Sequence, residues 1–355
     1  MSISISALPE AQRGQCPAQY SFGSGFSDHM FTQAYDVGQG WHDAQIRPFE
    51  NFSLSPAAAV LHYSQEIFEG LKAYRRRDGG INLFRPEANA ARFNRSASRM
   101  VMPEVDEALH VEAMKALVAL DSAWVPGDDG SSLYIRPAMI ATSPKLGLGA
   151  AGSYLHFVIT NPAGPYYPEG FNPVSVYVSD ECRRAVKGGV GEAKTGGNYA
   201  ASLFVSEAVA RQGYTQVLWL DAIEGRYVEE VGAMNICFVY DGQLIRTPEL
   251  SGSILPGITR DSLLKLAPTL GYEVEEARLD IHQVLDDIAS GRITEVFGCG
   301  TAAVVSPVGR MAMAGREYEI NGNETGPVAQ RLFDELMGIQ YGEREDPFGW
   351  IVPVN

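Results

Sequence analysis

The sequence predicts a two-domain protein of the α+β class. Its 355 residues exceed the usual size of a single domain. The segment 161–170 (NPAGPYYPEG) holds three prolines and two glycines, a composition typical of a linker. Helical and strand-like segments do not alternate regularly, which favours α+β over a βαβ arrangement. We expect a smaller first domain at 1–168, a linker at 169–182 and a larger second domain at 183–355.

The first half contains two convincing helical segments among short apolar runs. Apolar patterning favours strands at 81–84, 132–138 and 154–160. Pro86 suits a first helical position, so a helix is expected from there toward Met100. A second helix is expected at 111–123, because the sequence WVPG that follows interrupts helical structure.

The pattern starts again after the linker. Asn198 is expected to cap a helix that ends just before Gly213. Segments 235–240 and 243–247 form a predicted hairpin that turns at Asp241-Gly242. The remaining expected elements are strands at 174–178, 216–220 and 293–297, a helix from Pro256-Gly257 to near Gly271, and a helix at 281–290.

Composition excludes several functional classes. The net charge of −15 argues against a broad nucleic-acid surface or an anionic-membrane surface. The four cysteines are too scattered for a disulfide framework, and the histidines lack the spacing of metal motifs, so no metal is expected. The N-terminus does not resemble a signal peptide, and no apolar run reaches the ~20 residues of a membrane span. We expect a cytoplasmic protein.

The glycine-rich segment 187–199 (KGGVGEAKTGGNY) is the most informative part of the chain. It is compatible with a flexible surface loop, since five glycines permit unusual backbone angles. A phosphate-binding P-loop is a second interpretation, but Ala193 occupies the position of its second glycine. In the third interpretation a lysine carries pyridoxal phosphate as a Schiff base. The residues alone leave these three open.

The third interpretation needs an acid for the pyridine nitrogen and donors for a phosphate. Glu229-Glu230 precede an apolar strand, although a pair of glutamates is more often an exposed turn. Residues 256–261 (PGITRD) open a helix, where amide groups attract phosphate. Residues 298–301 (GCGT) form a second donor-rich turn. Each of these features also has an ordinary structural explanation.

The order of motifs resembles that of the branched-chain amino acid aminotransferases. They are fold type IV pyridoxal-phosphate enzymes, related in fold to D-amino acid aminotransferase. The resemblance covers nearly all of 22–353. Its motifs are 22–30 (FGSGFSDHM), 61–73 (LHYSQEIFEGLKA), 83–86 (LFRP), 133–137 (LYIRP), 194–199 (KTGGNY), 230–235 (EVGAMN), 254–259 (ILPGIT) and 295–301 (EVFGCGT).

The resemblance implies roles for individual residues. Lys194, in the second domain, would be the Schiff-base lysine and would also move the proton at the substrate α-carbon. Glu230 would contact the pyridine nitrogen and Tyr199 the phenolic oxygen of the cofactor. The phosphate would be bound by Arg92, Ile258, Thr259 and Thr301. The substrate would be contacted by Phe22, Tyr63, Tyr134, Tyr166, Arg136, Ala233, Thr301 and Ala302, with the aromatic residues around a branched side chain and Arg136 facing a distal carboxylate.

The sequence differs from some relatives at two places. Ala233 replaces a threonine, so only a backbone donor remains there. Ala303 and Ser306 replace the Cys-x-x-Cys of animal relatives, so no thiol switch of that kind is expected.

The implied activity is transamination of leucine, isoleucine and valine with 2-oxoglutarate, by a homodimer. The alternatives are D-amino acid aminotransferase or aminodeoxychorismate lyase activity on the same fold, a P-loop nucleotidase, and a non-catalytic binding protein.

Overall fold

The computed structural model describes residues 2–164 and 171–354, which pack into two units. Unit 1 comprises the described residues of 1–166, Ala193–Gly196 and the described residues of 338–355. Unit 2 comprises the described residues of 167–192 and Gly197–Met337. The boundaries drawn from the sequence assign Ala193–Gly196 and the C-terminal segment to the second domain. As boundaries of folding domains they stay a prediction.

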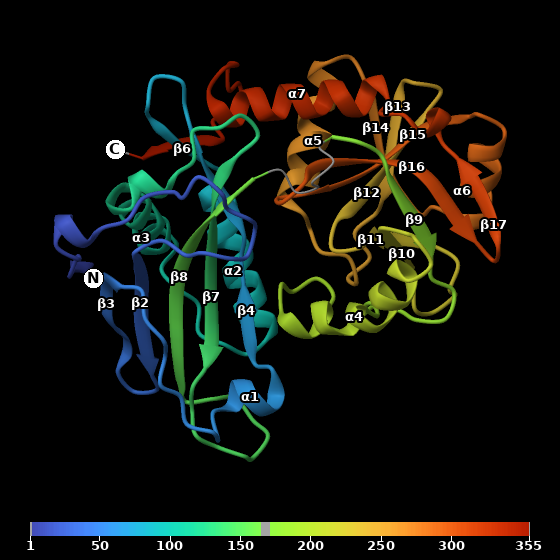
Figure 1. The fold of residues 1–355 in the computed structure, drawn as a ribbon. Helices are drawn as coiled ribbons and strands as arrows, with labels where there is room; N and C mark the ends of the chain where they lie inside the picture. Colours follow the sequence, from blue (N-terminus) through green and yellow to red (C-terminus); the bar gives the residue numbers. More distant parts are fainter. Residues whose placement is uncertain (1, 165–170, 355) are drawn as a thin grey trace. The chain divides into compact units, whose positions relative to one another are not determined.

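Unit 1 is built on a nine-stranded sheet, counted over the described residues. Its hydrogen-bonded order is β1 (Ser4–Ile5), β3 (Gly40–Pro48), β2 (His29–Asp36), β8 (Ser153–Ala163), β7 (Ser132–Ala141), β5 (Leu71–Arg75), β6 (Ile81–Phe84) and β18 (Ile351–Val354), and β4 (Glu66–Phe68) pairs with β7 (Figure 1). The parallel pair is β1–β3, and the other pairs are antiparallel. Both termini of the described chain therefore belong to this unit.

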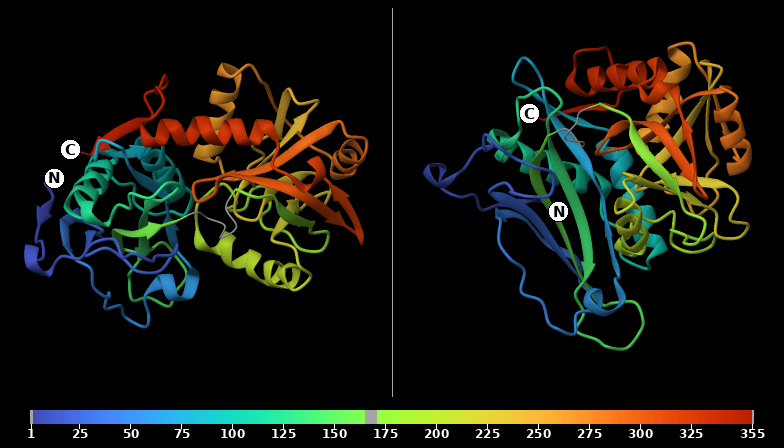
Figure 2. Two further views of the ribbon diagram at one scale, coloured as in Figure 1. Left: turned by 45° about the horizontal axis from the view of Figure 1, so that its top comes forward. Right: turned by 45° about the vertical axis from the view of Figure 1, so that its right-hand side comes forward.

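Helices cover the sheet of unit 1 through its apolar side chains. They are α1 (Ala59–Tyr63), α2 (Pro86–Arg99) and α3 (Glu107–Leu120), with short 3-10 turns at Glu10–Gln12 and Ser122–Trp124. Met114 and Leu117 of α3 pack with Phe31 and Leu133 of the sheet, and all four are fully buried. Each such side chain stabilises the fold by roughly 1.5–3 kcal/mol relative to exposure. Figure 2 shows the elements from two further sides.

Unit 2 contains the second nine-stranded sheet of the described chain. The order is β11 (Val228–Val231), β10 (Gln216–Leu220), β9 (Val174–Val178), β16 (Val304–Met313), β15 (Ile293–Gly300), β12 (Asn235–Tyr240), β13 (Leu244–Pro248) and β14 (Glu273–Ala277), and β17 (Arg316–Glu319) pairs with β16. Its helices are α5 (Ile258–Thr269) and α6 (Ile281–Ala289), with a 3-10 turn at Asn321–Asn323. Two helices continue into unit 1 at one end: α4 (Gly196–Ala210) and α7 (Pro327–Tyr341).

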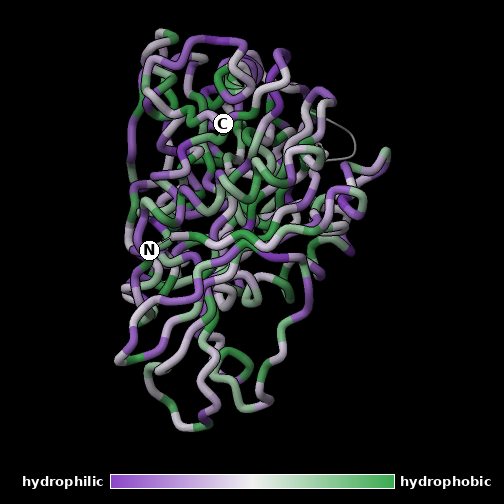
Figure 3. Tube along the Cα trace, turned by 90° about the vertical axis from the view of Figure 1, so that its left-hand side faces the viewer, coloured by the Kyte–Doolittle hydropathy of each residue, from purple (hydrophilic) through white to green (hydrophobic). Residues whose placement is uncertain are grey.

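The core of unit 2 follows from the apolar strands. Phe238 and Ile236 of β12 are fully buried, and Ile281 and Val284 of α6 pack into the same cluster. Figure 3 colours the trace by hydropathy, and the peripheral loops contain both hydrophilic and hydrophobic residues. Across the described residues, the helices are too short or too polar to traverse a lipid bilayer.

Most sequence-predicted elements are present, with shifted ends. The hairpin turns at Asp241 and Gly242, whose φ angles of 51° and 69° fit the predicted turn. The helix expected at 111–123 begins earlier, because Asp106 caps it by accepting from the Leu109 amide at 3.0 Å. The prediction for Asn198 is wrong: it lies inside α4, and its side-chain amide donates to the Val190 carbonyl at 2.8 Å.

Candidate functional site

The segment that contains Lys194 packs in unit 1 along β4 and α2. The Lys194 amide donates to the Ser96 hydroxyl at 2.9 Å, and its carbonyl accepts from the Phe68 amide at 3.0 Å. The Thr195 hydroxyl donates to the Glu66 carbonyl at 2.8 Å. Both backbone groups of Lys194 are therefore engaged, so the position of this lysine's backbone is set by β4 and α2.

A carboxylate secures the end of the same segment. The Gly196 amide donates to Oε1 of Glu66. Burial raises the pKa of the Glu66 carboxyl, while the Gly196 amide, the Thr195 hydroxyl and Arg136 act in the opposite direction. A Cβ at position 196 would lie 2.3 Å from Oε1 of Glu66, so a larger residue there would displace this carboxylate.

The ring of Phe68 connects Lys194 with predicted substrate residues. Nζ of Lys194 lies 4.9 Å from the ring centroid, and Cζ of Arg136 lies 4.8 Å from it. Nη2 of Arg136 donates to the Tyr134 hydroxyl at 3.2 Å. Phe22 meets Tyr134 edge to face, with centroids 4.8 Å apart. The structure thus places four predicted residues (Phe22, Tyr134, Arg136 and Lys194) in one cluster of unit 1.

Gly70 allows this cluster to form. A Cβ at position 70 would lie 1.9 Å from the Tyr134 hydroxyl, far inside van der Waals contact. The close approach therefore requires glycine, and it fixes where the Tyr134 hydroxyl lies.

Arg92 lies on the same face of α2 as Ser96, one helical turn earlier. It is 3% exposed and forms two hydrogen bonds to the fully buried Glu69, from Nε at 2.7 Å and from Nη2 at 2.8 Å. Glu69 also accepts from the Gly70 amide at 3.1 Å. This bidentate pair fixes the plane of the guanidinium, which has five N–H donors in all.

Glu230 is the centre of the predicted residues in unit 2. It is 3% exposed on β11 and forms an ion pair with Nη2 of Arg184 at 2.5 Å. Its Oε1 accepts from the Leu255 amide at 3.2 Å and from the Asn235 side chain at 3.4 Å. A buried carboxylate that is held by several donors can also accept from the N–H of a protonated ring nitrogen.

The start of α5 is tied to the same cluster. The Asn235 side chain donates to the Leu255 carbonyl at 3.0 Å. It also lies close to Gly257, where an added Cβ would be only 1.9 Å from Oδ1 of Asn235. Gly257 precedes α5 and caps it without a side-chain hydrogen bond. Ile258 and Thr259 are its first two residues, and first-turn amides have no acceptor within a helix, which suits them to a phosphate.

Ala233 and Thr301 lie in turns at one end of the β12–β15 strand pair. The last pair of that ladder is Asn235 of β12 with Cys299 of β15. Val231 and Met234 exchange backbone hydrogen bonds of 2.9 Å around Ala233. Thr301 and Ala302 follow directly after β15. The structure thus brings Glu230, Ala233, Ile258, Thr259, Thr301 and Ala302 to neighbouring strand ends and turns of unit 2.

The remaining predicted residues are Tyr63, Tyr199 and Tyr166. Tyr63 is 39% exposed at the end of α1, and its hydroxyl donates to the Leu146 carbonyl. Tyr199 lies on α4, where its carbonyl accepts from the Ser202 hydroxyl at 2.7 Å. Tyr166 lies outside the described residues.

Sequence reasoning missed the residues that hold the site residues in place. Ser96, Glu66 and Phe68 position Lys194 in unit 1, and Arg184 and Asn235 position Glu230 in unit 2. Glu66 and Phe68 stand inside the motif 61–73, and Asn235 is the last residue of the motif 230–235. Nothing local to Ser96 or Arg184 indicates a role, because their partners are distant in the chain.

The P-loop interpretation lacks its structural context. A P-loop follows directly from a buried strand and opens a helix at its lysine. Here β9 ends at Val178, well before the glycines, and within the described part of the chain no strand lies between it and Lys194. The helix begins at Gly196, after the lysine.

Comparison with known sequences gives a consistent set of relatives. The family model described as "Amino-transferase class IV" matches residues 66–311. A probable branched-chain-amino-acid aminotransferase of Streptomyces coelicolor is 53% identical over 345 residues, which cover 97% of this chain and 95% of that one. Branched-chain-amino-acid aminotransferase 2 of Bacillus subtilis is 48% identical over 338 residues, covering 95% and 93%.

Solved structures agree with the sequence relatives. A branched-chain amino acid aminotransferase of Escherichia coli superposes with a TM-score of 0.76 at 28% identity, covering 91% of this chain and 99% of that one. The T.th. branched-chain amino acid aminotransferase with pyridoxamine 5′-phosphate gives a TM-score of 0.75 at 28% identity, covering 92% and 98%. The predicted fold class is confirmed.

Proposed function

Because the chain belongs to the class IV aminotransferase family, it is an aminotransferase, and we propose that it acts on L-leucine, L-isoleucine and L-valine. The amino group would pass to 2-oxoglutarate, giving branched-chain 2-oxo acids and L-glutamate, reversibly. Relatives named branched-chain-amino-acid aminotransferase are about half identical over nearly the whole chain, which supports this assignment. The structural observation that carries the proposal is one cluster of unit 1. In it Lys194 and Arg136 lie over the ring of Phe68, and Tyr134 contacts both Arg136 and Phe22.

The cofactor of the family is pyridoxal 5′-phosphate, and the residues of both units suit it. A lysine with a fixed backbone, a buried carboxylate paired with Arg184 and a helix start without a side-chain cap are the groups that it needs. When bound, the cofactor supplies a ring that accepts the electrons released at the substrate α-carbon.

Each cofactor residue has a proposed task. Lys194 carries the cofactor through its amine and then holds and returns the proton of the substrate α-carbon. Glu230 keeps the pyridine nitrogen protonated, and Tyr199 donates to the phenolic oxygen. The phosphate is bound by Arg92, the amides of Ile258 and Thr259, and Thr301.

The substrate residues fall into two groups, one for apolar and one for charged parts of the substrate. Phe22 and Tyr134 form the aromatic surface for a branched side chain, and the resemblance adds Tyr63 and Tyr166 to it. Arg136 binds the distal carboxylate of glutamate or 2-oxoglutarate, since a guanidinium matches a carboxylate in geometry. The α-carboxylate is received by backbone groups at Ala233 and Ala302 and by Thr301. One surface would then accept both kinds of substrate.

The assembly and location are part of the proposal. We propose a homodimer, which the exposed apolar side chains of Leu203 (64% exposed) and Phe204 (78% exposed) on α4 support. We place it in the cytoplasm, where thiols stay reduced. Cys16, Cys182, Cys237 and Cys299 are all free thiols, as is usual there.

The first test follows the cofactor absorbance of the purified protein. Addition of L-leucine should bleach the visible band, and 2-oxoglutarate should restore it. D-leucine should leave the band unchanged, which distinguishes the proposal from a D-amino acid aminotransferase. Lys194→Ala should abolish turnover, while Lys145→Ala, an exposed lysine of the same unit, should retain it. Turnover of L-leucine by Lys194→Ala would overturn the assignment.

A further inference from the structure

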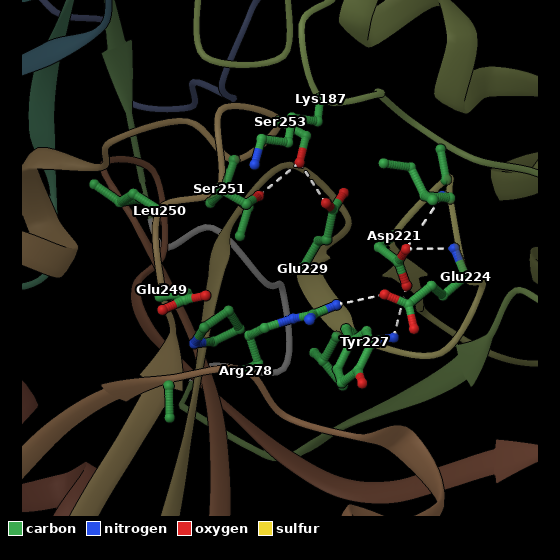
Figure 4. Close-up of a pocket in the computed structure, with 16 residues that line it drawn as sticks. Lys187, Asp221, Glu224, Tyr227, Glu229, Glu249, Leu250, Ser251, Ser253 and Arg278 are labelled. Atoms are coloured by element: carbon green, nitrogen blue, oxygen red, sulfur yellow. Dashed lines mark hydrogen bonds and ion pairs between the residues drawn. The ribbon is translucent and has the colours of Figure 1, made fainter.

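Unit 2 contains a cavity of about 520 Å³ whose lining residues all belong to that unit (Figure 4). It lies beside β11 and the loops that follow β10 and β13. Its polar lining includes Lys187, Glu229, Glu249 and Arg278, and its apolar lining includes Leu250 and Ile254. Its volume is ample for a small organic molecule.

The carboxyl of Glu229 gives this cavity a specific chemistry. Glu229 is 5% exposed and precedes Glu230 on β11, so the two side chains point to opposite faces of the strand. Oε1 of Glu229 accepts from the Ser253 hydroxyl, whereas Oε2 is buried and has no hydrogen-bond partner among the described residues. Burial raises the pKa of the Glu229 carboxyl. A buried acceptor without a hydrogen-bond partner is energetically costly, and a donor from a bound ligand would remove that cost.

Three other charged groups of the lining already have partners. Asp221 accepts from four backbone amides at 2.7–3.1 Å. Burial would raise its pKa, but those amides lower it to about 2. Arg278 pairs with Glu224 at 2.7 Å and lies 3.6 Å from the centre of the Tyr227 ring. Neither Asp221 nor Arg278 therefore competes for a ligand of the cavity.

The remaining charges are one cation and two acids. Lys187 is exposed, forms no ion pair with the described residues, and extends over the side of the cavity that carries Ser251 and Ser253 (Figure 4). Glu249 is exposed at the rim, whereas Glu229 is buried. The cavity thus offers an acceptor inside, a cation at its edge and apolar walls from Val228, Leu250 and Ile254.

We propose that this cavity binds a small aliphatic α-amino acid. Its ammonium group donates to Oε2 of Glu229, its carboxylate faces Lys187, and its side chain packs on the apolar walls. A ligand of this class carries both charges that the cavity complements, and it brings the donor that Glu229 lacks.

The experiment is calorimetric titration of the protein in its cofactor-bound form with N,N-dimethyl-L-leucine. This probe keeps the charges and the side chain, but its tertiary amine does not condense with an aldehyde. An excess of 4-methylpentanoate, which has no amine, is present to occupy the proposed substrate site. Glu229→Gln should weaken binding at least tenfold. Glu249→Gln, with the same change of charge at the rim, should change it less than twofold.

A second variant keeps the test independent of folding. Lys187→Met alters an exposed side chain and should weaken binding about fivefold with an unchanged melting temperature. Equal affinities of the wild type and Glu229→Gln, an unchanged affinity of Lys187→Met, or no binding at millimolar probe would each overturn the proposal. Because the titration involves no turnover, its failure is distinct from a failure of the aminotransferase assay.

Discussion

The hydroxyl of Tyr134 occupies space that is open only because Gly70 has no side chain. Its ring contacts Phe22, and its oxygen accepts from Arg136, so its position determines the arrangement of the whole cluster. Arg136 in turn lies over the ring that Lys194 also contacts. One missing methyl group is therefore a requirement of the proposed substrate surface.

Gly70→Ala should damage substrate binding more than turnover. The new Cβ would displace Tyr134, and overpacking of this kind costs about 1–3 kcal/mol. We expect the KM for L-leucine to rise roughly tenfold, as for a misfitted apolar pocket. Steady-state kinetics and urea unfolding measure the two effects. Gly152→Ala is the control, because its Cβ would meet only ordinary contacts. An unchanged KM in Gly70→Ala would contradict the role of Tyr134.

At the residue scale, the sequence indicates which residues carry chemistry but not how they are held. Lys194 and Glu230 stand in recognisable motifs, and each is found in a cluster of fixed side chains. Arg92 pairs with Glu69 because α2 lies beside the end of β4. Arg184 pairs with Glu230 because the loop that carries Arg184 lies beside β11. Such contacts join positions far apart in the chain, so no local pattern predicts them.

At the scale of elements, helix α3 and strand β8 meet through two buried histidines. His110 and His156 have rings 4.9 Å apart, with Nδ1 of His110 3.1 Å from Nε2 of His156. Burial lowers the pKa of His110 to about 4 and that of His156 well below its usual value. Both rings therefore stay neutral at the pH values at which a free histidine, with a pKa near 6.5, begins to take up protons.

Acid should therefore weaken the contact between α3 and β8. Between about pH 6.5 and 4 the unfolded chain binds protons that the folded chain does not, so stability falls as the pH falls. Urea unfolding at pH 7 and pH 5 should show a smaller loss for His110→Leu/His156→Leu than for the wild type. His282→Leu, at an exposed position, should retain the wild-type loss. Equal losses in all three proteins would contradict this explanation.

Elements with a clear local signal are predictable from the sequence, and those without one are not. Pro86 and the Asp241-Gly242 turn fix their elements through backbone angles, and both are found as expected. Strand β8 runs to Ala163, into the segment 161–170 whose composition is typical of a linker, because its last residues pair with β7. Strand β16 and helix α7 have no counterpart among the expected elements. The ten residues of β16 form a strand through partners on both sides, which only the folded sheet provides.

At the scale of the whole molecule, charge and exposed apolar surface act in opposite directions. The net charge of −15 favours solubility and opposes association of like chains. The exposed apolar residues of α4 favour association. The proposed dimer requires the second effect to exceed the first.

Sedimentation should give a mass twice the 38.6 kDa of the chain. Because salt screens like charges, dilution at low salt should dissociate the dimer more readily than dilution in about 0.5 M sodium chloride. Phe204→Glu adds a charge to the apolar surface and should shift the mass toward the monomer, whereas Glu207→Gln on the same helix should not. A monomeric mass for the wild type at micromolar concentration would contradict the dimer.

Asp221 holds the loop between β10 and β11 by accepting hydrogen bonds from four of its backbone amides. Beyond this loop the two strands pair in a register that turns Glu229 and Glu230 to opposite faces of β11. A shift by one position turns every side chain of a strand to the opposite face. An insertion between 222 and 226 that shifted this register by one position would therefore exchange the environments of Glu229 and Glu230 without altering either amino acid.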